Sequence, residues 1–198
     1  MWCVIWKKDD IYSIFTNQIF ESNKKALEFK NKQTSFRKKH DAKVLFSSKS
    51  MEWATPRPFF MRLNEQFNFT LDPCAQSHNA LCSRYYTAEE DGLKQNWAGN
   101  QVFVNPPYGR GIKEWVKKCY EEGTKKDTTV VMLIPARTDT KYWHDYVMRA
   151  DEIRFVKGRI KFGGGNNSAP FPSAVVVFRH DQGHPTENPP KIFSMSNT

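Results

Sequence analysis

The stretch Gln101-Val102-Phe103-Val104-Asn105-Pro106-Pro107-Tyr108 joins a short apolar segment to an asparagine, two prolines and a tyrosine. Its first four residues predict a β-strand, which the two prolines end at once because they fix φ and lack an N–H group. The side-chain oxygen of Asn105 and the carbonyl of Pro106 can then both accept hydrogens from one amine. Tyr108 adds a flat face, so the stretch predicts a site for an aromatic amine such as adenine N6. The alternative is an ordinary strand-to-turn junction, since Asn and Pro are common turn residues.

The sequence on both sides of this stretch has an α/β pattern. Thr55-Pro56 predicts the start of a helix that runs to about residue 66, because proline suits the first turn. Residues 129–134 are a nearly unbroken apolar run, which is typical of a strand covered on both faces. We also expect strands at 67–71, 102–104, 152–156, 159–162 and 173–179, and helices at 75–84, 112–122 and 141–149. Strands that alternate with helices predict a mostly parallel sheet with helices on both sides.

Two of the predicted strands end in polar residues. Asp72 follows the strand at 67–71, and Asn105 follows the strand at 102–104. Ligands of such sheets bind beyond the carboxyl ends of the strands, so we expect both side chains to face one crevice. Their short separation in sequence predicts a trimmed sheet that lacks some central strands.

The 198-residue chain is long enough for one compact domain and an appendage. We expect a small basic ββαβ accessory unit at residues 1–48, a main domain at 50–180 and a loose C-terminal tail at 181–198. The net charge is +9, and residues 1–50 hold eleven Lys and Arg against five Asp and Glu. This charge favours a polyanionic partner, although a basic surface can also serve solubility alone.

The sequence does not indicate a membrane protein or a metalloprotein. No apolar run approaches the ~20 residues that cross a bilayer, and the N-terminus has no signal-peptide pattern. We therefore expect a cytoplasmic protein with no membrane partner. The four cysteines form no Cys-x-x-Cys pair and the histidines have no metal-ligand spacing, so we expect free thiols and no bound metal.

Further motifs occur in order along the chain. They are Thr55-Pro56, Leu71-Asp72-Pro73, Asp91-Gly92-Leu93, Trp97, Pro135-Ala136-Arg137-Thr138-Asp139-Thr140 and Ala169-Pro170-Phe171-Pro172-Ser173. Together with Asn105 to Gly109, they closely resemble the phage and prophage DNA N6-adenine methyltransferases, the Dam-like family, over roughly residues 50–180. The resemblance implies a Rossmann-like methyltransferase fold, S-adenosylmethionine as methyl donor, adenine in double-stranded DNA as acceptor, and the host cytoplasm as location.

The resemblance also implies roles for individual residues. Catalysis falls to Asn105, Pro106, Pro107 and Tyr108. Donor binding falls to Thr55, Pro56, Asp72, Pro73, Asp91 and Leu93. The chain departs from the family of amino-methyltransferases in the turn Cys74-Ala75-Gln76-Ser77, which has no glycine. The backbone cradle of the donor must therefore be built in another way.

Adenine N6 is a poor nucleophile because its lone pair is delocalised into the ring. Two acceptors draw it toward tetrahedral geometry, so positioning alone can drive a direct in-line transfer to an extruded base.

Arg137, Thr138 and Asp139 follow a buried strand and are candidates for DNA contact; the alternative is a helix start capped by Thr138 or Asp139. Arg159 and Lys161 are further DNA candidates beside a glycine-rich loop.

Two other functions remain open from the sequence. An Asn-Pro-Pro-Tyr site also serves methyltransferases that act on adenine in RNA or on a glutamine amide in a protein. The glycine-free turn after Asp72 also permits a catalytically silent DNA-binding relative that no longer holds the donor.

Overall fold

The structure is a computed structural model that describes residues 53–164, 168–179 and 189–197. All of them belong to the second of the chain's two units, residues 49–198. The predicted accessory unit at residues 1–48 lies outside the described residues, as do residues 181–188 and 198 of the predicted tail.

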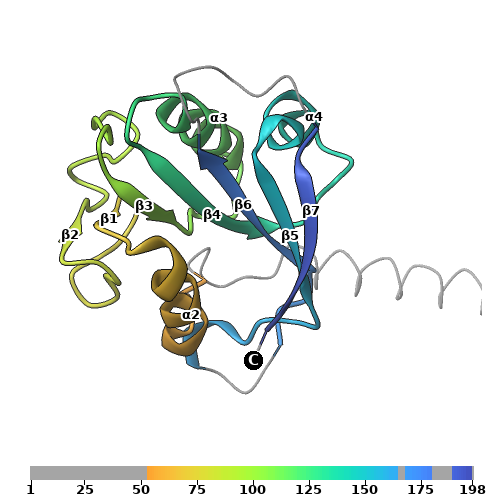
Figure 1. Cartoon of the computed structure of the whole chain (residues 1–198). Coiled ribbons are helices and arrows are strands. Elements are labelled where there is room, and N and C mark those ends of the chain that lie inside the picture. Colours follow the sequence, from red (N-terminus) through yellow and green to blue (C-terminus); the bar gives the residue numbers. More distant parts are fainter. Residues whose placement is uncertain (1–52, 165–167, 180–188, 198) are drawn as a thin grey trace, which may run out of the picture. The chain divides into compact units, whose positions relative to one another are not determined.

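The described residues form one seven-stranded sheet in the order β2-β1-β3-β4-β6-β5-β7 (Figure 1). The strands are β1 (Leu71–Asp72), β2 (Arg84–Tyr85), β3 (Gln101–Val104), β4 (Thr129–Pro135), β5 (Glu152–Lys157), β6 (Ser173–Arg179) and β7 (Lys191–Ser196). Only β6 runs against its neighbours, because it pairs antiparallel with both β4 and β5 while every other pair is parallel. The predicted α/β class with a mostly parallel sheet is confirmed.

Helices cover both faces of this sheet (Figure 1). Helix α2 (Arg57–Phe67) packs on one face, and α3 (Ile112–Gly123) and α4 (Lys141–Asp145) pack on the other. Every residue of β4 is buried. Val130, Met132 and Ile134 point toward α3 and α4, whereas Val131 and Leu133 point toward α2. This alternation is why residues 130–134 are all apolar.

Three predicted elements are wrong. Residues 75–83 form turns and bends rather than a helix, and Arg84 already belongs to β2. Residues 159–161 are not a strand but lead into a short 3₁₀ turn, Phe162–Gly164. The strand predicted from residue 67 begins only at Leu71, since α2 runs on to Phe67 and ends at Asn68 in the left-handed conformation. These segments are short, so their own sequence specifies them weakly against tertiary contacts.

The predicted loose tail is also wrong for residues 191–196, which form β7. This strand pairs with β5 along its whole length, from Lys191 opposite Glu152 to Ser196 opposite Lys157. The sheet is not trimmed in its centre either. β1 and β3 are direct neighbours, and the shortening falls on β1 and β2 at one edge, each of which has two residues.

Candidate active site

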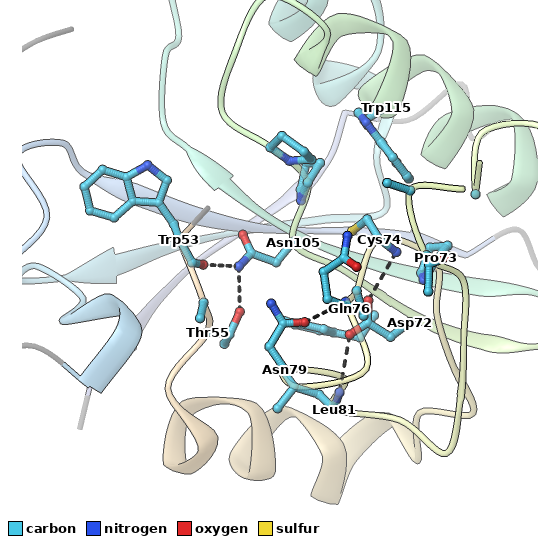
Figure 2. A pocket seen from close by; sticks show the side chains of 18 of the residues that line it. Trp53, Thr55, Asp72, Pro73, Cys74, Gln76, Asn79, Leu81, Asn105 and Trp115 are labelled. Atoms are coloured by element: carbon cyan, nitrogen blue, oxygen red, sulfur yellow. Dashed lines mark hydrogen bonds between the residues drawn. The ribbon is translucent and has the colours of Figure 1, made fainter. Parts of the chain in front are cut away.

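A cavity of about 350 Å³ opens where β1 and β3 end. Asp72 and Asn105 both line it, so the two strand ends predicted to face one crevice do so (Figure 2). Six other residues expected at the site line the same cavity: Thr55, Pro73, Asp91, Leu93, Pro106 and Pro107. The cavity lies at the edge of the sheet where α/β proteins bind ligands.

The Asn105 amide is held at both of its ends. Its Nδ2 group donates to the carbonyl of Trp53 and to Oγ1 of Thr55, at 2.8 Å from the latter (Figure 2). Its Oδ1 atom accepts the hydroxyl of Tyr108 at 2.7 Å. These bonds consume both amide hydrogens and fix which end of the amide carries the oxygen. One lone pair of that oxygen is left for a further donor.

Tyr108 lies behind Asn105 in a cluster of aromatic rings. Its ring is nearly parallel to that of Trp53, with centroids 6.5 Å apart, and edge-on to Phe162 and Phe171 at 6.0 Å and 5.5 Å. Burial raises the pKa of the Tyr108 hydroxyl well above its usual value. The hydroxyl therefore stays protonated and able to donate to Asn105. We call Trp53, Tyr108, Phe162 and Phe171 the aromatic cluster.

Asp72 is a buried carboxyl with only distant hydrogen-bond donors. Its oxygens accept from the backbone N–H groups of Cys74 at 3.4 Å and Leu81 at 3.5 Å (Figure 2). Burial raises the pKa of Asp72 to about 6, and the two N–H groups lower it by less than burial raises it. At pH 7 the group is mostly an ionised carboxylate with weak compensation. A cation placed beside it in the cavity would gain a strong electrostatic partner.

The glycine-free turn after β1 is held by a side chain. Oδ1 of Asn79 accepts the backbone N–H of Gln76 at 2.7 Å (Figure 2). The close backbone approach that glycine allows occurs instead at Gly92, on a neighbouring loop. A Cβ atom at Gly92 would stand 1.9 Å from the carbonyl oxygen of Pro73, so no other residue fits there without a shift of the backbone.

The cavity wall at Gly92 is supported from behind by Trp97 and a buried carboxylate. The Trp97 indole donates to the carbonyl of Gly92 at 2.9 Å, and its backbone N–H donates to Oε2 of Glu122 at 3.0 Å. Lys118 and Lys125 reach Oε1 of Glu122 at 2.6 Å and 2.8 Å. Burial raises the pKa of Glu122, but these donors outweigh it, so the pKa lies below its usual value.

Several predicted site residues do not line the cavity. They are Pro56, Tyr108, Arg137, Thr138, Asp139, Arg159 and Lys161. Pro56 is the N-cap of α2, and its carbonyl accepts the N–H of Phe60. Thr138 and Asp139 do not cap a helix, because α4 begins after Thr140. Both Arg159 and Lys161 are exposed.

The sequence also left cavity residues unidentified. They include Trp53, Cys74, Gln76, Asn79, Leu81, Thr87 and Trp115. For Trp53 there was a signal, because it stands two residues before the Thr55-Pro56 motif. Asn79 and Leu81 come from turns that the sequence pattern predicted to be helical, so nothing indicated which of their side chains or backbone groups would face the cavity.

Comparison with known proteins agrees with this geometry. The family model described as DNA N-6-adenine-methyltransferase (Dam) matches residues 42–196, somewhat more than the 50–180 span of the predicted resemblance. The chain belongs to the Dam family. The Rossmann-like methyltransferase fold predicted from the resemblance is therefore confirmed, with the N-terminal appendage outside the described residues.

This Dam-family chain is similar to the following named proteins. It is 34% identical over 113 residues to a DNA N-6-adenine-methyltransferase of Haemophilus phage HP1 (strain HP1c1), a match to 56% of this chain and 65% of that protein. It is 32% identical over 107 residues to the enzyme of the same name from Escherichia phage T1, covering 53% of this chain and 44% of that one. The putative methyltransferase YfdM of Escherichia coli (strain K12) is 38% identical over 64 residues, covering 29% of this chain and 70% of that protein. The matches thus span less than two thirds of either phage enzyme.

Two further findings concern the described part of the chain alone. None of its helices has the length and apolar character needed to cross a bilayer. Within the same residues, no group of three or more His, Cys, Asp or Glu side chains is arranged to hold a metal ion.

Proposed function

We propose that this Dam-family protein transfers the methyl group of S-adenosylmethionine to the N6 amine of adenine in double-stranded DNA. The observation that carries the proposal is the fixed orientation of the Asn105 amide at the rim of the cavity shared with Asp72. A chain of the same family is expected to use the same chemistry, and the two phage relatives carry that activity in their names.

The cavity suits S-adenosylmethionine in size and charge. Its volume of about 350 Å³ lies within the range of small-molecule sites. The donor supplies a methyl group on a positively charged sulfur and also carries an ammonium group. Asp72, with its poorly compensated buried carboxyl, is the group in the cavity that gains most from a cation. Thr55, Pro73, Asp91 and Leu93 would complete the walls, and Pro56 would hold the segment that carries Thr55.

Asn105 and Pro106 would position the acceptor amine. The remaining lone pair of Asn105 Oδ1 and the carbonyl of Pro106 would accept hydrogen bonds from the two N–H groups of the amine. The lone pair of the amine nitrogen would then point at the methyl carbon. The N–C bond forms as the S–C bond breaks, and the methylated amine then releases one proton to solvent. Positioning supplies most of the rate enhancement in such a transfer. Pro107 keeps the turn rigid.

DNA would be held by stacking and by charge. The target base must leave the duplex, which costs a few kcal/mol, and stacking against the Tyr108 side of the aromatic cluster returns about 1–3 kcal/mol. Arg159 and Lys161 are exposed cations suited to phosphate contact. Arg137, Thr138 and Asp139 follow β4 at its carboxyl end, the same edge of the sheet that carries Asn105.

The proposal is tested by offering the full-length protein three acceptors with methyl-labelled S-adenosylmethionine: duplex DNA, RNA of the same sequence, and protein. We expect label in duplex DNA alone, recovered after digestion as N6-methyladenine. Label in RNA or protein but not in DNA would assign another acceptor. Donor binding in calorimetry with no transfer to any acceptor would contradict the proposal.

A further inference from the structure

The Asn105 amide has two possible orientations, and its function depends on which of them the site holds. An amide can turn by half a rotation and exchange its oxygen with its NH₂ group, with little change in shape. Only one of the two orientations presents an acceptor to an incoming amine. In the other, two N–H groups would face the two N–H groups of the substrate.

The segment before α2 holds the Asn105 amide in the orientation that presents its oxygen. The Trp53 carbonyl can only accept a hydrogen bond, so it excludes the amide oxygen from its side. The Thr55 hydroxyl takes the second amide hydrogen at 2.8 Å. On the other side, Tyr108 donates to the oxygen. Figure 2 shows both Nδ2 bonds converging from this one segment onto Asn105.

The backbone around Thr55 is well suited to hold a side chain in place. Pro56 is extended, with φ −60° and ψ 130°, and restricts the residue before it to extended conformations. Helix α2 follows directly and is anchored in the core by Phe59, Phe60 and Leu63, each at most 4% exposed. The Thr55 hydroxyl is thus fixed relative to the strand that carries Asn105.

We propose that the Thr55 hydroxyl is a positioning group for the Asn105 amide, holding its oxygen toward the substrate amine. The proposal rests on the proposed function and gives Thr55 a task different from the donor binding expected from its motif. A residue that acts through Asn105 should affect the transfer step. A residue that contacts the donor should affect donor affinity.

Two substitutions at Thr55 separate these tasks. Thr55→Val keeps the shape and removes the hydroxyl, and Thr55→Ser keeps the hydroxyl. With saturating donor and duplex DNA, we expect Thr55→Val to lower kcat about tenfold, the loss of one ordinary hydrogen bond, with Thr55→Ser within about twofold of wild type. The Kd for S-adenosylmethionine, measured by calorimetry, should change by less than about threefold in both.

Thr128→Val is the matched control. Thr128 is a buried threonine directly before β4, at the edge of the sheet opposite to Asn105, and its hydroxyl accepts the N–H of Gly99 at 2.9 Å. We expect it to lower the unfolding temperature while kcat, measured well below that temperature, stays at the wild-type value. A fall in kcat from Thr55→Val alone therefore reports positioning rather than lost stability.

Two kinetic or binding results, besides the coupling result below, would overturn the inference: an unchanged kcat in Thr55→Val, or a loss of donor affinity as large as the loss in kcat. A wild-type protein that methylates no DNA would instead contradict the proposed function, and the inference with it. A coupling free energy near zero between Thr55→Val and Asn105→Ala in urea unfolding would show that the hydrogen bond itself contributes nothing, again overturning the inference.

Discussion

At the scale of single residues, the site consists of a few polar groups whose partners determine what they can do. Asn105 has its NH₂ group bound by Trp53 and Thr55 and its oxygen bound by Tyr108. The Tyr108 hydroxyl also lies 3.3 Å from the carbonyl of Leu133, so it has a second acceptor within reach when a substrate amine approaches Asn105.

Tyr108 therefore has two separable contributions, its ring and its hydroxyl. Tyr108→Phe keeps the ring stacked and removes one hydrogen bond to Asn105, so kcat should fall about threefold to tenfold with little change in DNA affinity. Tyr108→Ala also removes the stacking face and should weaken DNA binding by roughly 1–3 kcal/mol. Fluorescence anisotropy with duplex DNA and a turnover assay distinguish the two. Equal DNA affinities for the Phe and Ala variants would contradict a stacking role.

Asp72 should make both donor binding and stability depend on pH. Its pKa is about 6 in the folded protein against 3.8 as the ordinary value, because burial disfavours the charge. Ionisation therefore destabilises the fold. This penalty is absent below pH 4 and grows as pH rises to about 6, reaching roughly 3 kcal/mol for a shift of this size. Donor binding has the opposite trend, since a cationic ligand needs the ionised form.

We expect the affinity for S-adenosylmethionine to fall about tenfold from pH 7 to pH 5 in the wild type. Asp72→Asn should bind the donor weakly at both pH values. In urea unfolding, Asp72→Asn should be more stable than wild type at pH 7 and lose that advantage near pH 4. Parallel pH profiles for the two proteins would show that another group titrates.

At the scale of elements, α3 supports the site through one buried carboxylate. Glu122 is 1% exposed and binds Lys118, Lys125 and the N–H of Trp97, whose indole holds the wall at Gly92. Glu122→Gln keeps the shape but removes the charge on which both lysines depend. Hydrogen bonds to charged groups contribute about 1.5–3 kcal/mol, so we expect a loss of roughly 2 kcal/mol in the free energy of unfolding.

Glu121→Gln is the control for this prediction because it lies on the same helix. Its partner is Lys117 at 3.5 Å, and both side chains are more than half exposed. An exposed pair of this kind contributes about 0.5 kcal/mol or less, so urea unfolding should hardly change. Similar losses from the two variants would contradict the special role of the buried carboxylate.

The elements also differ in how far their sequences determine them. β4 could be predicted because it is a nearly continuous apolar run. α3 could be predicted because its apolar residues Ile112, Val116 and Cys119 recur at helical spacing. β7 could not, because none of its residues is fully buried and it forms through backbone pairing with β5. Asn105 and Asp72 were predictable from their position at strand ends. The hydrogen bond from the Gln76 N–H to the Asn79 side chain depends on a loop whose path no local pattern specifies.

At the scale of the whole molecule, charge should govern DNA affinity. The chain carries a net charge of +9. If Arg159 and Lys161 contact phosphates, replacing both with Ala should lower the slope of log K against log salt by about 2. Replacing Lys113 and Lys117, which lie beside Glu114 and Glu121 on α3, should leave the slope unchanged. Equal slopes for wild type and the Arg159/Lys161 variant would exclude this surface from the DNA contact.

The central claim is that Asn105 acts by holding the substrate amine against the methyl group. A single-turnover assay with Asn105→Ala, saturated with S-adenosylmethionine and duplex DNA, tests it most directly. We expect the rate of methyl transfer to fall by about a hundredfold or more, as when one preorganised hydrogen-bonding group is removed from an active site, while the Kd values for donor and DNA stay within a few-fold of wild type. A near wild-type rate of transfer in Asn105→Ala would contradict the claim.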